Sequence, residues 1–114
     1  MDMVRPIHVV FFRLDSGREP VRDWLKKLNR ESRKTIGEDI KTLQFRWPVG
    51  MPLTRKMADD LWELRSHLVS GVARTFFTVY DEKIVLLHGF VKKSRKTPAK
   101  ELAVARRRLT KLRL

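Results

Sequence analysis

The sequence contains no cysteine, and this absence removes two kinds of chemistry. Disulfide bonds and thiolate metal sites are both excluded. Histidine occurs only three times, and no His-x-x-x-His pair or acidic cluster has the spacing of a metal site. The sequence also lacks a glycine-rich phosphate loop and a nucleophile elbow. We therefore expect a protein that uses neither a metal nor an organic cofactor.

Long apolar runs are also missing. None approaches the roughly 20 residues that a helix needs to span a bilayer. The N-terminal segment reads MDMVRPIHVVFFRLD, which alternates as a strand does and is not followed by the small-residue cleavage site of a signal peptide. A chain of 114 residues with 42% hydrophobic residues is large enough for one buried core. We expect a single cytoplasmic domain that spans residues 1–114.

Acidic residues are scarce relative to basic ones. The chain has 26 Lys and Arg residues against 13 Asp and Glu residues, which gives a net charge of +13. The excess is greatest in residues 92–114, which hold ten basic residues and one acid, Glu101. Such an asymmetry indicates a surface for nucleic acid, for an acidic protein or for an anionic membrane. The membrane is the least favoured of the three, because no segment has the apolar length to enter one.

The first half of the chain predicts one strand and two helices. Ile7–Leu14 is rich in β-branched and aromatic residues and ends at a turn cluster, so it is expected to be a strand. Pro20 suits the first position of a helix, and apolar residues at helical spacing follow it. Asn29 is a candidate N-cap for a second helix that stops at Pro48. We expect the two helices to pack on the sheet as a hairpin.

The second half predicts three strands and a final helix. Trp47–Asp60 contains two prolines and is interpreted as a loop. The three strand segments are Leu61–Arg65, Val72–Tyr80 and Lys83–Val91, and a turn at His67–Gly71 separates the first two. A basic helix then begins with Thr97 as its cap and Pro98 at its first position. The predicted order is β-α-α-β-β-β-α, which is an α+β fold because the strands segregate from the helices.

One stretch joins the predicted core to the basic end of the chain. Ile84–Pro98 reads IVLLHGFVKKSRKTP, which is a buried strand that delivers lysines to its own end. If the last three strands form an antiparallel meander, Arg65, Arg74 and the Lys92/Lys93 pair meet at one edge of the sheet. Cations gathered in this way repel one another unless an anion lies among them. Phosphate is the anion that such a cluster suits best.

Two further interpretations stay open from the residues alone. Strand ends often carry Arg and Lys because they are exposed to solvent, and Glu63 or Asp60 could pair with these cations.

The three tryptophans fall on apolar faces and are expected to pack in the core. Phe90 shares a strand face with His88 and Lys92. An aromatic ring beside cations can stack on a base, an interaction worth ~1–3 kcal/mol.

These residues resemble a known family. The segments LWELR, LLHGFVKKSRKTP and AKELAVARRR, with Arg74 opening an aromatic-rich strand, resemble the HigB-like, phage-derived branch of the RelE/ParE toxin superfamily. The likeness in element order covers nearly the whole chain, and its specific part is Leu61–Arg108. It implies a RelE/ParE-like fold in which two N-terminal helices pack on an antiparallel-rich sheet and a basic C-terminal helix follows.

The resemblance also implies an activity and partners. These proteins are toxins of type II toxin–antitoxin modules that cleave messenger RNA on the ribosome, in the region of its 16S rRNA, and so stop translation. A cognate helix-turn-helix antitoxin neutralises the toxin in a hetero-oligomeric complex. The ribose 2′-hydroxyl is the nucleophile of metal-free cleavage, so Arg65 and Arg74 are expected to stabilise charge on the phosphate. Either Lys92 or Lys93 is expected to move protons. The residues expected to hold flanking RNA are Phe90, Arg95, Lys96, Arg106 and Arg107.

The chain departs from the superfamily at one point. The better-known ribonucleases often carry a tyrosine or a histidine near the C-terminus, and the final helix here has neither. His88 and Tyr80 are the candidate substitutes for acid–base work. The same departure fits the ParE-like class, which inhibits DNA gyrase without cutting RNA. A non-enzymatic basic module that binds nucleic acid is the third hypothesis.

Overall fold

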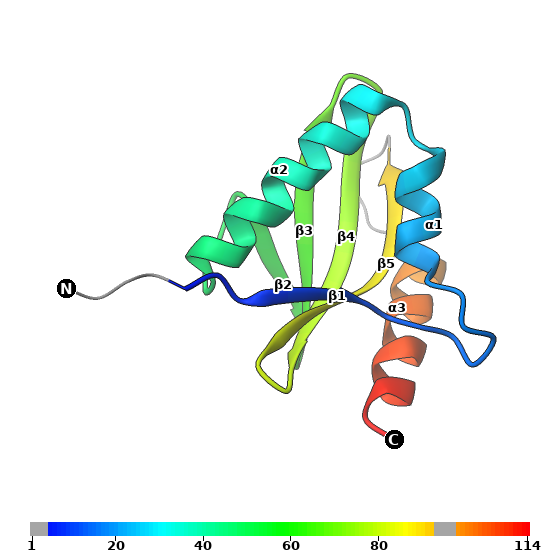
Figure 1. The fold of residues 1–114 in the computed structure, drawn as a ribbon. Coiled ribbons are helices and arrows are strands. Elements are labelled where there is room, and N and C mark those ends of the chain that lie inside the picture. Colours follow the sequence, from blue (N-terminus) through cyan, green and yellow to red (C-terminus); the bar gives the residue numbers. More distant parts are fainter. Residues whose placement is uncertain (1–4, 93–97) are drawn as a thin grey trace.

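The structure is a computed structural model that describes residues 5–92 and 98–114. Within these residues the chain forms five strands and three helices (Figure 1). They are β1 (His8–Phe11), α1 (Pro20–Lys27), α2 (Arg30–Arg46), β2 (Thr54–Ala58), β3 (Leu61–Leu68), β4 (Gly71–Tyr80), β5 (Lys83–Lys92) and α3 (Ala99–Leu112). The α+β class predicted from the sequence is confirmed.

The strands form one sheet in the order β1-β5-β4-β3-β2. β1 pairs with β5 in parallel, and the other three pairs are antiparallel. The predicted meander of the last three strands is therefore present. β3 runs further than predicted, to Leu68, so the turn into β4 is shorter than His67–Gly71.

One strand was not expected. β2 lies inside Trp47–Asp60, which the sequence indicates to be a loop, and it pairs with β3 at the edge of the sheet. Its sequence, TRKMA, has no apolar alternation, and two prolines precede it at positions 48 and 52. An edge strand depends on pairing with its neighbour rather than on its own pattern, so the sequence carried little signal for it.

The helix starts follow the predicted chemistry. Pro20 occupies the first position of α1, and the side chain of Asn29 caps α2 by accepting a hydrogen bond from the Ser32 N–H at 2.8 Å. In α3 the prediction is off by one residue, since the helix begins at Ala99 and Pro98 is the residue before it. The expected cap, Thr97, lies outside the described residues. In the described part of the chain, no helix has the length and apolarity to cross a membrane.

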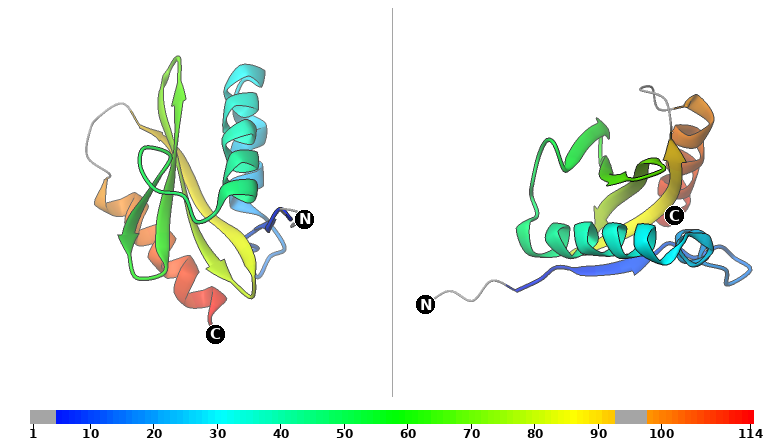
Figure 2. Two further views of the ribbon diagram at one scale, coloured as in Figure 1. Left: turned by 90° about the vertical axis from the view of Figure 1, so that its left-hand side faces the viewer. Right: turned by 90° about the horizontal axis from the view of Figure 1, so that it is seen from above.

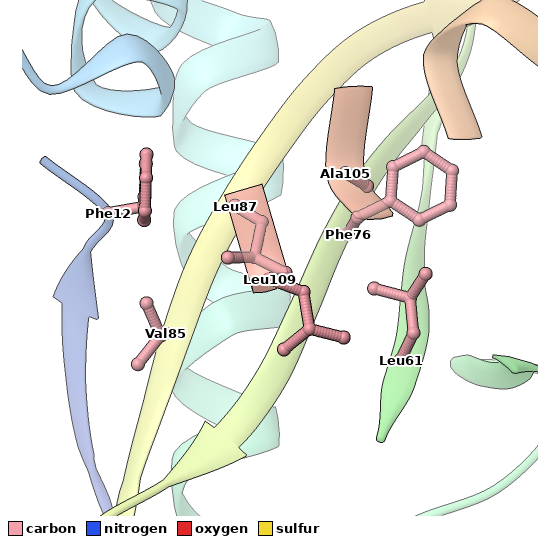
Figure 3. Close-up of a cluster of buried hydrophobic side chains, with 7 residues drawn as sticks. All are labelled: Phe12, Leu61, Phe76, Val85, Leu87, Ala105 and Leu109. Carbon is pink, nitrogen blue, oxygen red and sulfur yellow. The ribbon is translucent and has the colours of Figure 1, made fainter. Parts of the chain in front are cut away.

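The helices cover opposite faces of the sheet. α1 and α2 pack on one face, and α3 packs on the other (Figure 2). The core under α3 is built from seven buried side chains (Figure 3): Phe12, Leu61, Phe76, Val85, Leu87, Ala105 and Leu109. The opposite core contains six, which are Val21, Leu43, Leu64, Phe77, Ile84 and Leu86. Trp24, Trp47 and Trp62 pack against the second core, as predicted.

A bulge in β5 sets which side chains face α3. Phe76 pairs with His88, but the next residue, Phe77, pairs with Leu86, so Leu87 is the extra residue. Leu87 lies in the core under α3, and the ring of His88 also stacks on Phe76, which is part of that core. A bulge of this kind turns two successive side chains to one face. The rest of β5 then presents Phe90 and Lys92 on the α3 side.

The glycine of the HGF segment allows α1 to approach β5. A Cβ atom added to Gly89 would lie 2.3–2.9 Å from three ring atoms of Trp24. Such distances are well inside van der Waals contact, so any larger residue must displace the indole or the strand. The glycine in the middle of a strand therefore has a packing role, on the face opposite α3.

Candidate anion site

A cluster of charged side chains lies on the α3 face of the sheet. Register pairing places Arg65 of β3 directly opposite Arg74 of β4, and Arg74 opposite Phe90 of β5. Lys92 pairs with Val72, two residues before Arg74 on β4. The structure thus brings together Arg65, Arg74 and Lys92, as the antiparallel argument predicts. Their roles in catalysis stay predictions.

A buried carboxylate lies at the centre of these cations. Arg74 Nη1 donates a hydrogen bond to Glu63 Oε1 at 2.5 Å, and Arg65 Nε lies 3.9 Å from the same oxygen. Glu63 is fully buried and Arg74 is 4% exposed. The alternative considered from the sequence, that Glu63 pairs with the arginines, is therefore present in the structure together with the convergence of cations. The cluster of cations and the ion pairs with Glu63 therefore belong to one site.

Sequence reasoning missed one cation near the cluster. Arg55 of β2 pairs in register with Glu63, so its side chain points to the same face of the sheet. It is exposed, and its charge is close enough to lower the pKa of Lys92. The sequence of Trp47–Asp60 predicts a loop, so it contains no signal that places Arg55 beside β3.

The side chain of Lys92 is buried beside the two arginines. Its side chain is 4% exposed, and no residue in the described ranges accepts a hydrogen bond from its Nζ. Burial lowers the pKa of Lys92 below its ordinary value, the charge of Arg74 lowers this pKa further, and Glu63 acts in the opposite direction. Lys93, the other candidate, lies outside the described residues.

Three buried donors point to an anion. Arg65 Nε, Arg74 Nε and Lys92 Nζ have no hydrogen-bond acceptor among residues 5–92 and 98–114. A buried donor without an acceptor costs ~1–3 kcal/mol, and more when it is charged. Three such donors from adjacent strands suit a phosphate, because its oxygens accept several charge-assisted hydrogen bonds. The cluster is therefore a candidate phosphate site.

Replacing Lys92 with methionine should stabilise the free protein. The change removes a buried charge that three arginines repel, and we expect a gain on the order of 1 kcal/mol, or roughly 4 °C in the unfolding midpoint at pH 7. The folded chain holds the Lys92 proton less tightly than the unfolded chain does. Wild-type stability should therefore rise as the pH increases toward 10.5, the ordinary lysine value. In the variant this part of the rise should be missing. Thermal unfolding across this pH range measures both effects. A variant less stable than wild type would contradict the conclusion that Lys92 is a buried charge that destabilises the free protein.

His88 is tied to α3 through both ring nitrogens. Its Nε2 lies 3.2 Å from Glu101 Oε1, and its Nδ1 lies 3.3 Å from Arg108 Nη1. Because a guanidinium can only donate, Nδ1 is the acceptor and Nε2 carries the proton that Glu101 receives as a hydrogen bond. Burial is the main cause that lowers the pKa of His88, which favours this neutral form. The structure therefore gives His88 a tethering role between β5 and α3.

The remaining candidates lie in different places. Phe90 is half-buried, with its ring centroid 6.0 Å from that of His88 and 5.9 Å from that of Phe76. Tyr80 lies six residues beyond Arg74 on β4, roughly 20 Å away along the strand. The structure does not bring Tyr80 to the cluster.

The basic residues expected to hold RNA are only partly described. Arg106 and Arg107 are exposed on α3. Arg95 and Lys96 lie outside the described residues, as Lys93 does. No group of three or more His, Asp or Glu side chains in the described chain is placed to hold a metal ion.

A separate cavity opens at the other end of the sheet, beside Tyr80. It has a volume of about 610 Å³ and is lined by β1, the β4–β5 turn and the end of α3. Val10, Tyr80 and Leu112 contribute to its mainly apolar lining. Its acids are neutralised locally, since Asp15 binds Lys111 and Asp81 pairs with Lys83. Among the described residues, the unpartnered buried cations lie at Arg65, Arg74 and Lys92 and not in this cavity, so we place the candidate site at these three residues.

Fold and site together define a small α+β protein with a buried cationic cluster on one face of its sheet. A family model described as phage-derived protein Gp49-like (DUF891) matches residues 23–110. The chain belongs to this Gp49-like family. The matched segment includes Glu63, Arg65, Arg74 and Lys92. A search of curated proteins finds no matching relative.

Proposed function

We propose that this chain is the toxin of a type II toxin–antitoxin module and cleaves messenger RNA on the ribosome without a metal ion. The observation that carries the proposal is the convergence of Arg65, Arg74 and Lys92, with three buried donors that have no acceptor in the described chain. Membership of the phage-derived Gp49-like family supports it, because the sequence resembles the HigB-like, phage-derived toxins.

The proposed reaction begins with attack by the ribose 2′-hydroxyl. Its oxygen forms a bond to phosphorus while the bond from phosphorus to the 5′-oxygen breaks, and the 2′-hydroxyl proton passes to solvent water. Arg65 and Arg74 stabilise the charge that develops on the phosphate oxygens. Protonated Lys92 gives its proton to the leaving 5′-oxygen and regains one from solvent. Its lowered pKa makes it a better acid than an exposed lysine.

The partners follow from the charge and the resemblance. Exposed Arg106 and Arg107 would contact messenger RNA or the 16S rRNA region of the ribosome, since salt-dependent phosphate contacts are the usual role of such residues. A helix-turn-helix antitoxin with acidic segments would complement the net charge of +13 in a hetero-oligomeric complex.

Controlled expression in bacteria tests the proposal. Wild-type protein should arrest growth and leave transcripts cut within their coding regions. Arg74→Ala and Lys92→Met variants should lose toxicity while they accumulate to the wild-type level. Full toxicity of both variants, or growth arrest with intact transcripts, would contradict the proposed activity.

A ParE-like gyrase inhibitor is the second candidate function. Two observations favour it: His88 has both ring nitrogens engaged, and Tyr80 lies at the far end of β4 from the cluster. A protein that only binds gyrase needs no acid or base. Accumulated DNA breaks with intact messenger RNA would support this candidate, and harmless expression would support a non-enzymatic binding module.

A further inference from the structure

Glu63 is a carboxylate that is completely buried within a cluster of cations, which is an unusual position for a charged side chain. Its side chain is fully buried, although charged side chains seldom lose all contact with solvent. It belongs to β3, and within the described residues it contacts Arg65 of the same strand and Arg74 of β4. A carboxylate in this place neutralises part of the charge that a phosphate would otherwise meet. Its presence therefore opposes anion binding and needs a reason.

The contact with Arg74 suggests the reason. A guanidinium has five N–H donors in a fixed plane, so one hydrogen bond at Nη1 restricts the direction of all the others. Arg74 uses Nη1 for Glu63, while its Nε donor has no acceptor in the described chain. Arg65 Nε lies 3.9 Å from the same carboxylate oxygen, and it too lacks a hydrogen bond in the described residues.

We infer that Glu63 is a positioning residue, which holds the guanidinium group of Arg74, and through its charge that of Arg65, in the orientation that binds the scissile phosphate. Glu63 itself does not contact the substrate. Its catalytic part rests on the proposed function, whereas its effect on anion binding does not. The proposed site gives up some affinity for its substrate so that its donors are aligned before the substrate arrives.

This role predicts opposite effects on binding and on turnover. Glu63→Gln removes one negative charge from the cluster and keeps a hydrogen-bond acceptor of the same size. Anion affinity should rise about threefold, because phosphate then meets one more unbalanced cation. Cleavage should slow by about tenfold or more, because a neutral amide holds the guanidinium less firmly. A residue that merely supports the fold would weaken both.

Inorganic sulfate and a cleavage-resistant RNA test the two effects. The unfolding midpoint is measured with and without sulfate, and sulfate should raise it more in Glu63→Gln than in wild type, since a bound anion stabilises the folded state. RNA with a 2′-deoxy group at the cut site should bind the variant more tightly, while normal RNA is cut more slowly on ribosomes. Glu63→Asp, which keeps the charge, should recover part of the rate. Glu38→Gln makes the same charge change on exposed α2 and should behave as wild type in every assay.

The outcomes separate this inference from the proposed function. Equal sulfate shifts in wild type and Glu63→Gln would overturn the role of Glu63, and this comparison stays informative if the variant is less stable. Parallel loss of RNA binding and cleavage would also overturn it. A larger sulfate shift in the variant, with no RNA cleavage by wild type, would support the anion site and refute the ribonuclease proposal alone.

Discussion

Replacing Arg74 with lysine should reduce messenger RNA cleavage by about 100-fold and relieve growth arrest, although the positive charge is kept. Lysine offers a single ammonium in place of the planar fork, so it cannot bind Glu63 through one edge and phosphate through another. The hydrogen bond from Arg74 Nη1 to Glu63 shows that one edge is already in use. Cleavage on purified ribosomes, measured by mapping the 5′ ends of the products, gives the rate directly.

Arg30→Lys is the matched control for this experiment. Arg30 is exposed at the start of α2, on the opposite side of the sheet from Arg74, so the same chemical change should leave cleavage at the wild-type rate. Circular dichroism and the unfolding midpoint separate loss of activity from loss of structure. If Arg74→Lys cleaved RNA as fast as Arg30→Lys, the guanidinium would have no special role.

Replacing Gly89 with alanine should have the largest effect on stability. The new methyl group would lie 2.3–2.9 Å from ring atoms of Trp24, and overpacking of this kind costs about 1–3 kcal/mol. A domain of this size would lose roughly 4–8 °C in its unfolding midpoint for each kcal/mol. Urea unfolding followed by tryptophan fluorescence measures the change and reports on the displaced indole.

Two further variants identify the cause of that loss. Gly37→Ala places the same methyl group on α2 where nothing lies within 4 Å, and it should stabilise the protein by about 1 kcal/mol, since alanine favours a helix. Trp24→Leu combined with Gly89→Ala should be less unstable than the sum of the two single changes predicts, because leucine makes room for the methyl group. Strict additivity would show that the contact between residues 24 and 89 is not the cause.

The position of the cluster could be predicted from the sequence alone. The prediction required only that β3, β4 and β5 form an antiparallel meander, and the structure contains that meander. Once the meander is assumed, the end of one strand must lie beside the start of the next. The placement of Arg65 opposite Arg74 follows from this register.

Details that depend on side-chain direction were harder to predict. Alternation predicts that neighbouring residues of a strand face opposite sides, but the bulge at Leu87 reverses the side on which the later residues of β5 lie. The sequence contains no sign of that bulge. The inward position of Lys92 therefore had to come from the structure.

The contributions of Glu63 and Arg55 to the charge of the site could not be predicted from the sequence either. Glu63 lies between two apolar residues on β3. This pattern fits a solvent-exposed side chain at the end of a strand as well as a buried ion pair. Arg55 belongs to an edge strand that has no sequence signature of its own. Both contacts arise from pairing between strands, which a single sequence specifies only weakly.

The ends left by cleavage test the central claim most directly. Purified protein is incubated with ribosomes that carry a defined messenger RNA, and the termini of the fragments are determined by mass spectrometry. Attack by the 2′-hydroxyl at the Arg65, Arg74 and Lys92 site predicts a 2′,3′-cyclic phosphate on one fragment and a 5′-hydroxyl on the other. Fragments with 3′-hydroxyl and 5′-phosphate ends, or RNA that stays intact, would contradict the account.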